Sequence, residues 1–202
     1  MSSTQEAEPP SRLAFTSIYL TRTQVSLVGK NGLIGLPRIL GSKTSTHQAI
    51  VQVMGTAMRI KAEIIEDKFS KLPELRRTLL LYTQTRLSYV GQLAACNRQH
   101  KIEKRLARWL LLVQDCLAVE ELPLTQEFIA NMLGTNRAGV TIAAGRLQKA
   151  GIISYTRGSI TVLERTRLEQ MSCECYDLMR QEQQRLFGDL YCQTYKKYEK
   201  AC

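Results

Sequence analysis

The sequence predicts a mixed α+β protein, with a small β-rich block near its N-terminal end and helices over most of the remainder. Three observations favour this class. Short runs rich in β-branched residues occur between residues 13 and 61. From Pro73 onward, apolar residues recur at spacings of three and four, which is typical of helices. Residues 124–163 combine two short helical patterns with a hairpin pattern, and the remaining elements flank this unit.

Length and composition limit the class of protein. The chain has 202 residues, a net charge of +10 and a mean hydropathy of −0.19. Its apolar runs are too short to span a membrane, and its N-terminal residues do not follow the signal-peptide pattern. We therefore expect a cytoplasmic protein without a membrane partner. The basic excess favours a polyanionic partner.

The N-terminal residues predict a leader and a small β-rich domain. Residues 1–21 are mostly polar at their start, and we expect them to be disordered or poorly ordered. Residues 22–72 are expected to form the β-rich domain. Its predicted elements are strands within 13–28, Gln48–Val53 and Ala57–Lys61, a short helix that opens at Pro37, and a helix over Ala62–Phe69.

A long helix follows, and residues 73–97 form the third predicted domain. Pro73 can open it, and the apolar pattern continues from Glu74 to Cys96 in two rows. Two rows predict two neighbours, one within the chain and one in a second copy of the helix. A central helix buried within one chain is the alternative. The expected dimerisation residues are Leu75, Leu79, Tyr82, Leu87, Val90 and Leu93.

Residues 98–190 are predicted to be a separate unit, which ends in a flexible tail over 191–202. The unit begins after a polar break at Asn97–His100, with a helix over Lys101–Leu117 whose Trp109 is expected in the core. It closes with a single amphipathic helix over Arg165–Phe187.

Between those helices lies the pattern on which the functional prediction depends. Thr125 can cap a helix that ends at Leu133, and Gly134 permits the left-handed turn that must follow. Asn136 can cap a second helix, 136–150. Gly151 ends it, and β-branched runs on both sides of Arg157-Gly158 predict a hairpin. Helix, turn, helix and hairpin in this order indicate a winged helix-turn-helix.

The charges of this unit fit double-stranded DNA as the partner. Asp and Glu are absent between Phe128 and Leu163, a window that contains Arg137, Arg146, Lys149 and Arg157. A surface that approaches phosphates should lack carboxylates, because DNA is a dense line of negative charge. A helical hairpin inside a larger core, with no nucleic acid involved, is the alternative.

We expect the second helix to lie in the major groove, with its first residues at the base edges. Arg137 is the main candidate for base contact, because its guanidinium can bind guanine with two hydrogen bonds. Arg146 is expected either to contact phosphate or to form a structural ion pair. The predicted DNA-binding residues are Thr125, Gln126, Asn136, Arg137, Ala138, Thr141, Ile142, Arg146 and Arg157.

The six cysteines and two histidines predict neither disulfides nor a metal site. Cys173 and Cys175 are two residues apart on one predicted helix, so they should point to different faces. We expect reduced thiols in the cytosol and no cofactor, with a redox-sensing thiol as the alternative. No arrangement of nucleophile and base suggests an enzyme.

The run LTQEFIANMLGTNRAGVTIAAGRLQKAGIISYTRGSITVL, with WLLLVQD before it and ECYDLMR after it, resembles the Crp/Fnr superfamily of bacterial transcription regulators. The resemblance covers roughly Val25–Leu186 and is most specific from Lys101 onward. It implies a cyclic-nucleotide-binding-like β-roll, a long dimerisation helix and a C-terminal winged helix-turn-helix. It also implies a homodimer that binds DNA and acts on RNA polymerase. Ala138 and Ile142 lie where other members often carry a Glu and an Arg, so base readout should differ here.

Two departures from the family pattern concern the roll. The chain begins too late to supply the early strands, so either the roll is partial or the true start lies upstream. The Gly-rich segment, residues 32–41, lacks the Glu of cyclic-nucleotide binders, and residues 45–49 lack their Arg. We therefore expect no cyclic nucleotide to bind, because its phosphate would be buried without a cation. An effector of another kind, or a shortened subunit that pairs with a full-length relative, are the alternatives.

Overall fold

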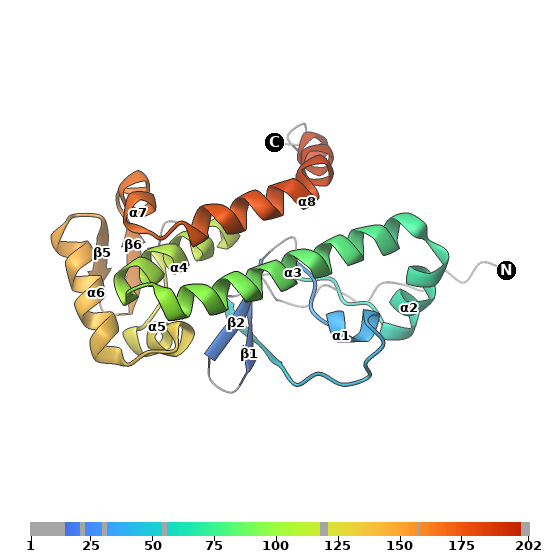
Figure 1. Ribbon diagram of the computed structural model, residues 1–202, viewed down its shortest axis with the longest axis horizontal. Coiled ribbons are helices and arrows are strands. Elements are labelled where there is room, and N and C mark those ends of the chain that lie inside the picture. Colours follow the sequence, from blue (N-terminus) through green and yellow to red (C-terminus); the bar gives the residue numbers. More distant parts are fainter. Residues whose placement is uncertain are drawn as a thin grey trace.

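The computed structural model describes residues 15–20, 23–29, 32–53, 56–117, 121–156 and 158–198 (Figure 1). The long helix α3 (Pro73–Gln99) runs along the molecule. Figure 1 places α1 and α2 towards one end of it, and α5, α6 and the β5–β6 hairpin at the other end. The fold class is therefore α+β, as predicted.

The N-terminal block contains an antiparallel sheet whose strand order is β2-β1-β3. The strands predicted within 13–28 and over Gln48–Val53 are confirmed, as are the short helix after Gly35 and the helix from Ala62. The bounds are β1 (Phe15–Leu20), β2 (Thr23–Val28), α1 (Leu36–Ile39), β3 (Gln48–Val53) and α2 (Ala62–Lys71).

Two predictions for this block were wrong. The strand expected over Ala57–Lys61 is not formed, and the side chain of Met58 is 93% exposed. A β-like run needs a neighbouring strand to pair with, and within 57–61 Ala57 alone forms an isolated β-bridge. Strand β1 is one of the strands predicted within 13–28, but it overlaps residues 1–21, which were expected to be disordered or poorly ordered. It is ordered by pairing with both β2 and β3.

Helix α3 has a covered face and an open face. Leu79 is buried, and α8 (Cys175–Tyr198) packs along the covered face. On the open face, Leu80, Leu87 and Val90 are 48%, 65% and 41% exposed. The helix continues to Gln99, so the polar break falls at His100 rather than at Asn97.

The C-terminal unit has the predicted order of helices and hairpin, with one further strand, β4, that closes its sheet in the order β4-β6-β5. Leu122 of β4 is fully buried, which anchors the segment before the helix-turn-helix. The bounds are α4 (Ile102–Leu117), β4 (Glu121–Leu122), α5 (Gln126–Leu133), α6 (Arg137–Lys149), β5 (Ile153–Thr156), β6 (Ser159–Val162) and α7 (Arg165–Met171).

One hydrophobic core joins the two ends of the chain. Trp109 of α4 is 2% exposed, as predicted, and Leu27 of β2 belongs to the same core. The indole Nε1 of Trp109 donates a hydrogen bond of 2.8 Å to Oε1 of Gln24, which is itself buried. The N-terminal sheet therefore packs directly on the winged unit.

The single helix predicted over Arg165–Phe187 was wrong, because the chain breaks between α7 and α8 at residues 172–174. The Ser172 hydroxyl donates to the Glu169 carbonyl at 2.8 Å, a local bond that competes with helix continuation. Beyond the break, α8 continues to Tyr198, into the tail expected to be flexible. Among the described residues, no helix is both long and apolar enough to cross a membrane.

Candidate nucleic-acid interface

The turn between α5 and α6 is fixed by two side-chain caps and one left-handed residue. Oγ1 of Thr125 accepts a hydrogen bond of 3.2 Å from the backbone N–H of Phe128. Oδ1 of Asn136 accepts one of 2.7 Å from the N–H of Gly139. Gly134 has a φ of 58°, where a side chain would be strained. These bonds hold the two helices in a helix-turn-helix arrangement.

Helix α6 has the two faces that a reading helix requires. Its buried face is the predicted apolar row of Val140, Ala143, Ala144 and Leu147. Its exposed side chains are Arg137, Ala138, Thr141, Ile142, Arg146, Gln148 and Lys149. Gln148 and Lys149 were not among the predicted site residues, although their distance of seven and eight positions from Thr141 places them on the same side of the helix. No residue of α6 is acidic.

A hydrogen bond connects the exposed face of α6 to the start of α5. Oγ1 of Thr141 lies 2.7 Å from Oε1 of Gln126 and 3.0 Å from the carbonyl oxygen of Arg137. The structure thus brings Gln126, Arg137 and Thr141 together at one edge of the surface. Thr125 and Asn136 lie beside them, but their side chains serve as caps.

The two arginines of α6 differ in their surroundings. Arg146 forms an ion pair with Glu103 of α4, which is the structural ion pair that the sequence left as one of two options. The Arg137 guanidinium, in contrast, makes no hydrogen bond or ion pair with other described residues, so it is available to a ligand. Ile142 is 57% exposed, and an exposed apolar side chain on this face can contact a thymine methyl group.

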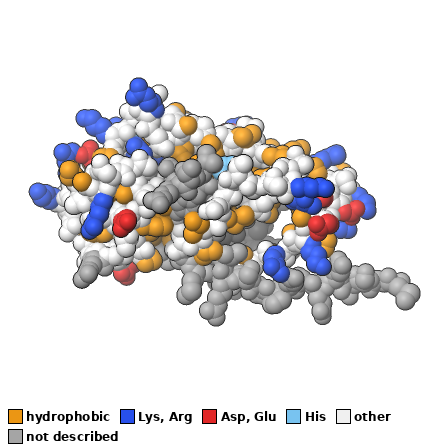
Figure 2. Space-filling model, turned by 90° about the horizontal axis from the view of Figure 1, so that it is seen from below, with side chains coloured by type: hydrophobic (Ala, Val, Ile, Leu, Met, Phe, Trp, Pro, Cys, Tyr) orange, Lys and Arg blue, Asp and Glu red, His pale blue; other side chains and the backbone are white. Residues whose placement is uncertain are grey.

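Basic side chains project from the end of the molecule that contains α5, α6 and the β5–β6 hairpin (Figure 2). Arg137, Arg146 and Lys149 of α6 belong to this end. The predicted wing-tip residue, Arg157, lies outside the described residues.

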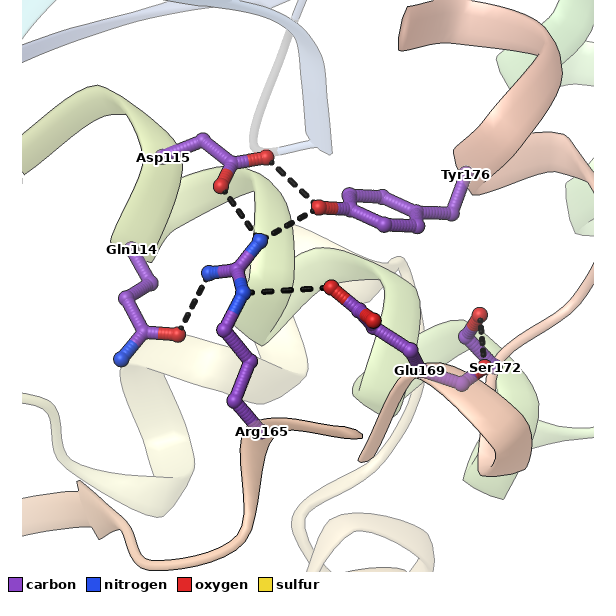
Figure 3. Close-up of polar contacts among 6 residues, drawn as sticks. All are labelled: Gln114, Asp115, Arg165, Glu169, Ser172 and Tyr176. Atoms are coloured by element: carbon purple, nitrogen blue, oxygen red, sulfur yellow. Dashed lines mark hydrogen bonds and ion pairs between the residues drawn. The ribbon is translucent and has the colours of Figure 1, made fainter. Parts of the chain in front are cut away.

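A network of polar side chains attaches α7, the helix that follows the β5–β6 hairpin, to α4 and α8 (Figure 3). Arg165 of α7 donates from Nη1 to Gln114 Oε1 (2.8 Å) and from Nε to Glu169 Oε1 (3.1 Å). Its Nη2 lies 2.7 Å from Asp115 Oδ1 and 2.6 Å from the Tyr176 hydroxyl. Burial, reinforced by the hydrogen bond to Asp115, raises the pKa of Tyr176 above its usual value. One guanidinium therefore joins α4, α7 and α8.

A cavity of about 460 Å³ lies between β2, α3, α4 and α8. Polar side chains from three helices line it together with apolar ones from β2. Among the lining residues are Leu27, Tyr82, Arg86, Asp115 and Arg180. Gly32, the first residue of the Gly-rich segment of the N-terminal block, also lines it. In that segment Arg38 is paired with Glu66 of α2 at 2.6 Å.

The predicted dimerisation residues divide between the two faces of α3. Leu79 is buried within the chain, and the Tyr82 ring packs edge-on against Phe187 at a centroid distance of 6.3 Å. Leu75 and Leu93 are half-buried. Leu87 and Val90 remain exposed, so of the predicted set these two are the most available to a second chain.

Comparison with known proteins agrees with this geometry. Residues 104–171 match the Crp-like helix-turn-helix domain. The chain is 25% identical over 149 residues to the fumarate and nitrate reduction regulatory protein of Vibrio cholerae, and 24% identical over 149 residues to an anaerobic regulatory protein of Pasteurella multocida. Each alignment covers 69% of this chain, but only 58% and 54% of those relatives. The chain thus spans little more than half the length of the curated relatives it matches.

Solved structures share the fold. FixK2 from Bradyrhizobium japonicum superposes with a TM-score of 0.69 at 19% identity, over 83% of this chain and 90% of that chain. A transcriptional regulator of the CRP/FNR family from Thermus thermophilus superposes with a TM-score of 0.66 at 18% identity, over 79% of this chain and 84% of that one.

Proposed function

Because this chain belongs to the Crp/Fnr family of transcription regulators, we propose that it is a sequence-specific regulator that binds double-stranded DNA through α6. The observation that carries the proposal is the exposed, acid-free face of α6, held by two capped helices. A protein of this kind acts on transcription in the cytoplasm by affecting RNA polymerase, and not as an enzyme.

We assign different tasks to the two ends of α6. Its first turn enters the major groove, where Arg137 contacts base edges and Thr141 and Ile142 complete the reading surface. Lys149 is in the last turn, further from the bases, and contacts phosphate. Gln126 supports Thr141 from the start of α5. Phosphate contacts position the protein, whereas base contacts specify the sequence.

Selection of bound sequences from random DNA tests the function, and two variants test the division of tasks. Arg137→Ala should lower affinity by about 1–3 kcal/mol at one base position and relax the preference there. Lys149→Ala should weaken binding about equally on all sequences and reduce the salt slope by about one. Fluorescence anisotropy on the selected site and on one changed at a single base compares the two. Equal losses on both sites for both variants would contradict the assignment.

We propose a homodimer as the active form. Leu80, Leu87 and Val90 form an exposed apolar row on α3, and a second copy of the same helix can cover it. Two winged units would then read a roughly palindromic site. Analytical ultracentrifugation at micromolar concentration tests this, and a monomer that binds its selected site at full affinity would overturn it.

A second candidate function, regulation by a small effector other than a cyclic nucleotide, is favoured by the cavity described above. It adjoins both α3 and the winged unit. Its two acidic lining residues, Asp115 and Glu182, are paired with Arg165 and Arg185, so Arg86 and Arg180 are the lining groups that suit an anionic ligand. The paired state of Arg38 agrees with the expectation that no cyclic phosphate binds in the Gly-rich segment. Thermal-shift screening against small organic anions, with cyclic AMP included, tests both points. If cyclic AMP raised the melting temperature and no other anion did, both the proposed effector class and the expected lack of cyclic-nucleotide binding would be contradicted.

A further inference from the structure

Four metal-ligating side chains converge where the long helix ends and α8 begins. Cys96 and His100 are one helical turn apart at the end of α3, while Cys173 lies within the break before α8 and Cys175 is the first residue of α8. Their ligand atoms all lie within 4.8 Å of one another. Sγ of Cys96 is 3.5 Å from Sγ of Cys173, and Sγ of Cys175 is 3.6 Å from Nδ1 of His100.

The two shortest of these separations match those around a single tetrahedral ion, and the other ligand atoms are no more than 4.8 Å apart. With Zn–S bonds of about 2.3 Å and a Zn–N bond of about 2.0–2.1 Å, tetrahedral angles place sulfurs about 3.8 Å apart and sulfur and nitrogen about 3.6 Å apart. An iron–sulfur cluster interposes several atoms between its outer thiolates, so it needs wider spacing. Three thiolates and one imidazole are also a donor set of structural zinc sites. We propose that Cys96, His100, Cys173 and Cys175 bind one Zn²⁺ ion.

Neighbouring polar groups orient the proposed ligands. Nε2 of His100 is 3.1 Å from Oε1 of Glu174, so Nδ1 is the nitrogen that faces the sulfurs. A carboxylate on the outer nitrogen of a metal-bound histidine fixes its orientation and tautomer. Nε2 of Gln92 donates to Sγ of Cys175 at 3.1 Å, and such a bond stabilises a thiolate. Groups from α3 and from the α7–α8 break thus support the ligands.

A buried arginine supplies an independent observation. Arg108 of α4 is 1% exposed, and in the described part of the chain its Nε and Nη2 have no hydrogen-bond partner. An uncompensated buried charge is costly. Its positive charge acts on both Cys96 and Cys173. Zn²⁺ with three thiolates carries a net charge of −1, so the metal site would provide the counter-charge that this guanidinium lacks.

The break between α7 and α8 explains why the sequence predicts no such site. On a continuous helix, Cys173 and Cys175 would point to different faces, and the expectation of no metal rested on that premise. The structure places Cys173 before the first turn of α8, where its backbone is free of helix geometry. The two sulfurs can therefore face a common centre. The ion would connect α3 to the α7–α8 junction, and so fix the winged unit on the long helix.

Zinc content and cobalt spectroscopy on the full chain test the proposal without any use of DNA. The wild-type protein, purified with reductant and without chelator, should contain one zinc ion per chain by elemental mass spectrometry. Replacement of zinc by Co²⁺ should give the visible d–d bands of tetrahedral cobalt and strong thiolate-to-cobalt charge-transfer absorption. Removal of the ion by a chelator should lower the melting temperature, because metal binding contributes to folding free energy.

Variants assign the ligands. Cys173→Ala and Cys175→Ala should lose the stoichiometric ion, whereas Cys116→Ala, a matched change of a half-buried thiol outside the cluster, should keep it. Glu174→Gln should keep the ion with about 10–100-fold weaker affinity. Where a variant fails to fold, the charge-transfer intensity of wild-type cobalt protein still reports the number of thiolate ligands.

Three results would overturn the proposal. The first is wild-type protein that retains no zinc or cobalt after loading with one equivalent under reducing conditions. The second is a Cys96–Cys173 disulfide in freshly purified protein, found by peptide mass spectrometry without reduction. The third is a cobalt spectrum without thiolate charge transfer. None of these results bears on DNA binding through α6, which the selection experiment tests separately.

Discussion

Replacement of Arg165 by methionine should destabilise the winged unit, because it removes four polar contacts at once and keeps most of the side-chain volume. The guanidinium contacts Gln114, Asp115, Glu169 and Tyr176 at distances between 2.6 and 3.1 Å. The Arg165 and Asp115 side chains are 38% and 34% exposed, so water screens the ion pairs. We therefore assign about 0.5 kcal/mol to each of the two ion pairs. The two neutral acceptors contribute about 1 kcal/mol each.

The sum is about 3 kcal/mol of unfolding free energy, or a fall of roughly 6–12 °C in melting temperature for a chain of this length. Urea denaturation followed by far-UV circular dichroism measures the free energy, with midpoint and slope both fitted. Arg167→Met is the matched control, because Arg167 is on the same helix and exposed, without an ion pair to other described residues. If the two variants differ by less than about 0.5 kcal/mol, the network does not stabilise the fold.

Three further outcomes can be checked by simple measurements. Leu87→Glu should turn the dimer into a monomer by sedimentation, because it places a charge in the exposed apolar row, whereas Lys104→Glu on the exposed side of α4 should leave the dimer intact. Asn136→Ala should lower the free energy of unfolding in urea by about 1 kcal/mol, because it removes the cap of α6. Asn131→Ala, which changes an exposed asparagine inside α5, should lower it clearly less. Equal losses would contradict the role of the cap. Burial, and then the charge of Asp115, raises the pKa of Cys116 to about 11. At pH 8.5, iodoacetamide should therefore alkylate this thiol more slowly in native protein than in urea, as followed by peptide mass spectrometry. Equal alkylation rates would exclude the pKa shift.

The helix-turn-helix could be predicted because its determinants are local. Thr125 and Asn136 bond to backbone N–H groups three residues ahead, and Gly134 needs only its own φ. The apolar row of α6 likewise follows from helical spacing, and its four members are all buried. Features that depend on residues within one helical turn of each other can be predicted from the sequence alone.

The metal-ligating cluster and the Arg165 network could not be predicted, because their partners are far apart in the chain. Cys96 and Cys173 are 77 residues apart, and Arg165 and Asp115 are 50 apart. The break that brings Cys173 into place has no Gly or Pro, so the amphipathic pattern of the sequence continues through it. Strand β4 was missed for a related reason, since two residues are too few to show alternation.

The contact between Trp109 and Gln24 gives the protein an internal optical probe. Trp109 is the only tryptophan of the chain, and its indole is held in the interface between the N-terminal sheet and α4. Because the same ring also packs against Phe128 of α5, its fluorescence reports on the separation of β2 from the winged unit as long as the winged unit itself stays folded. Such a separation would let water reach the indole and shift its emission to the red while helical circular dichroism stayed constant. Any ligand that moves these two parts relative to one another can thus be detected in the unlabelled protein.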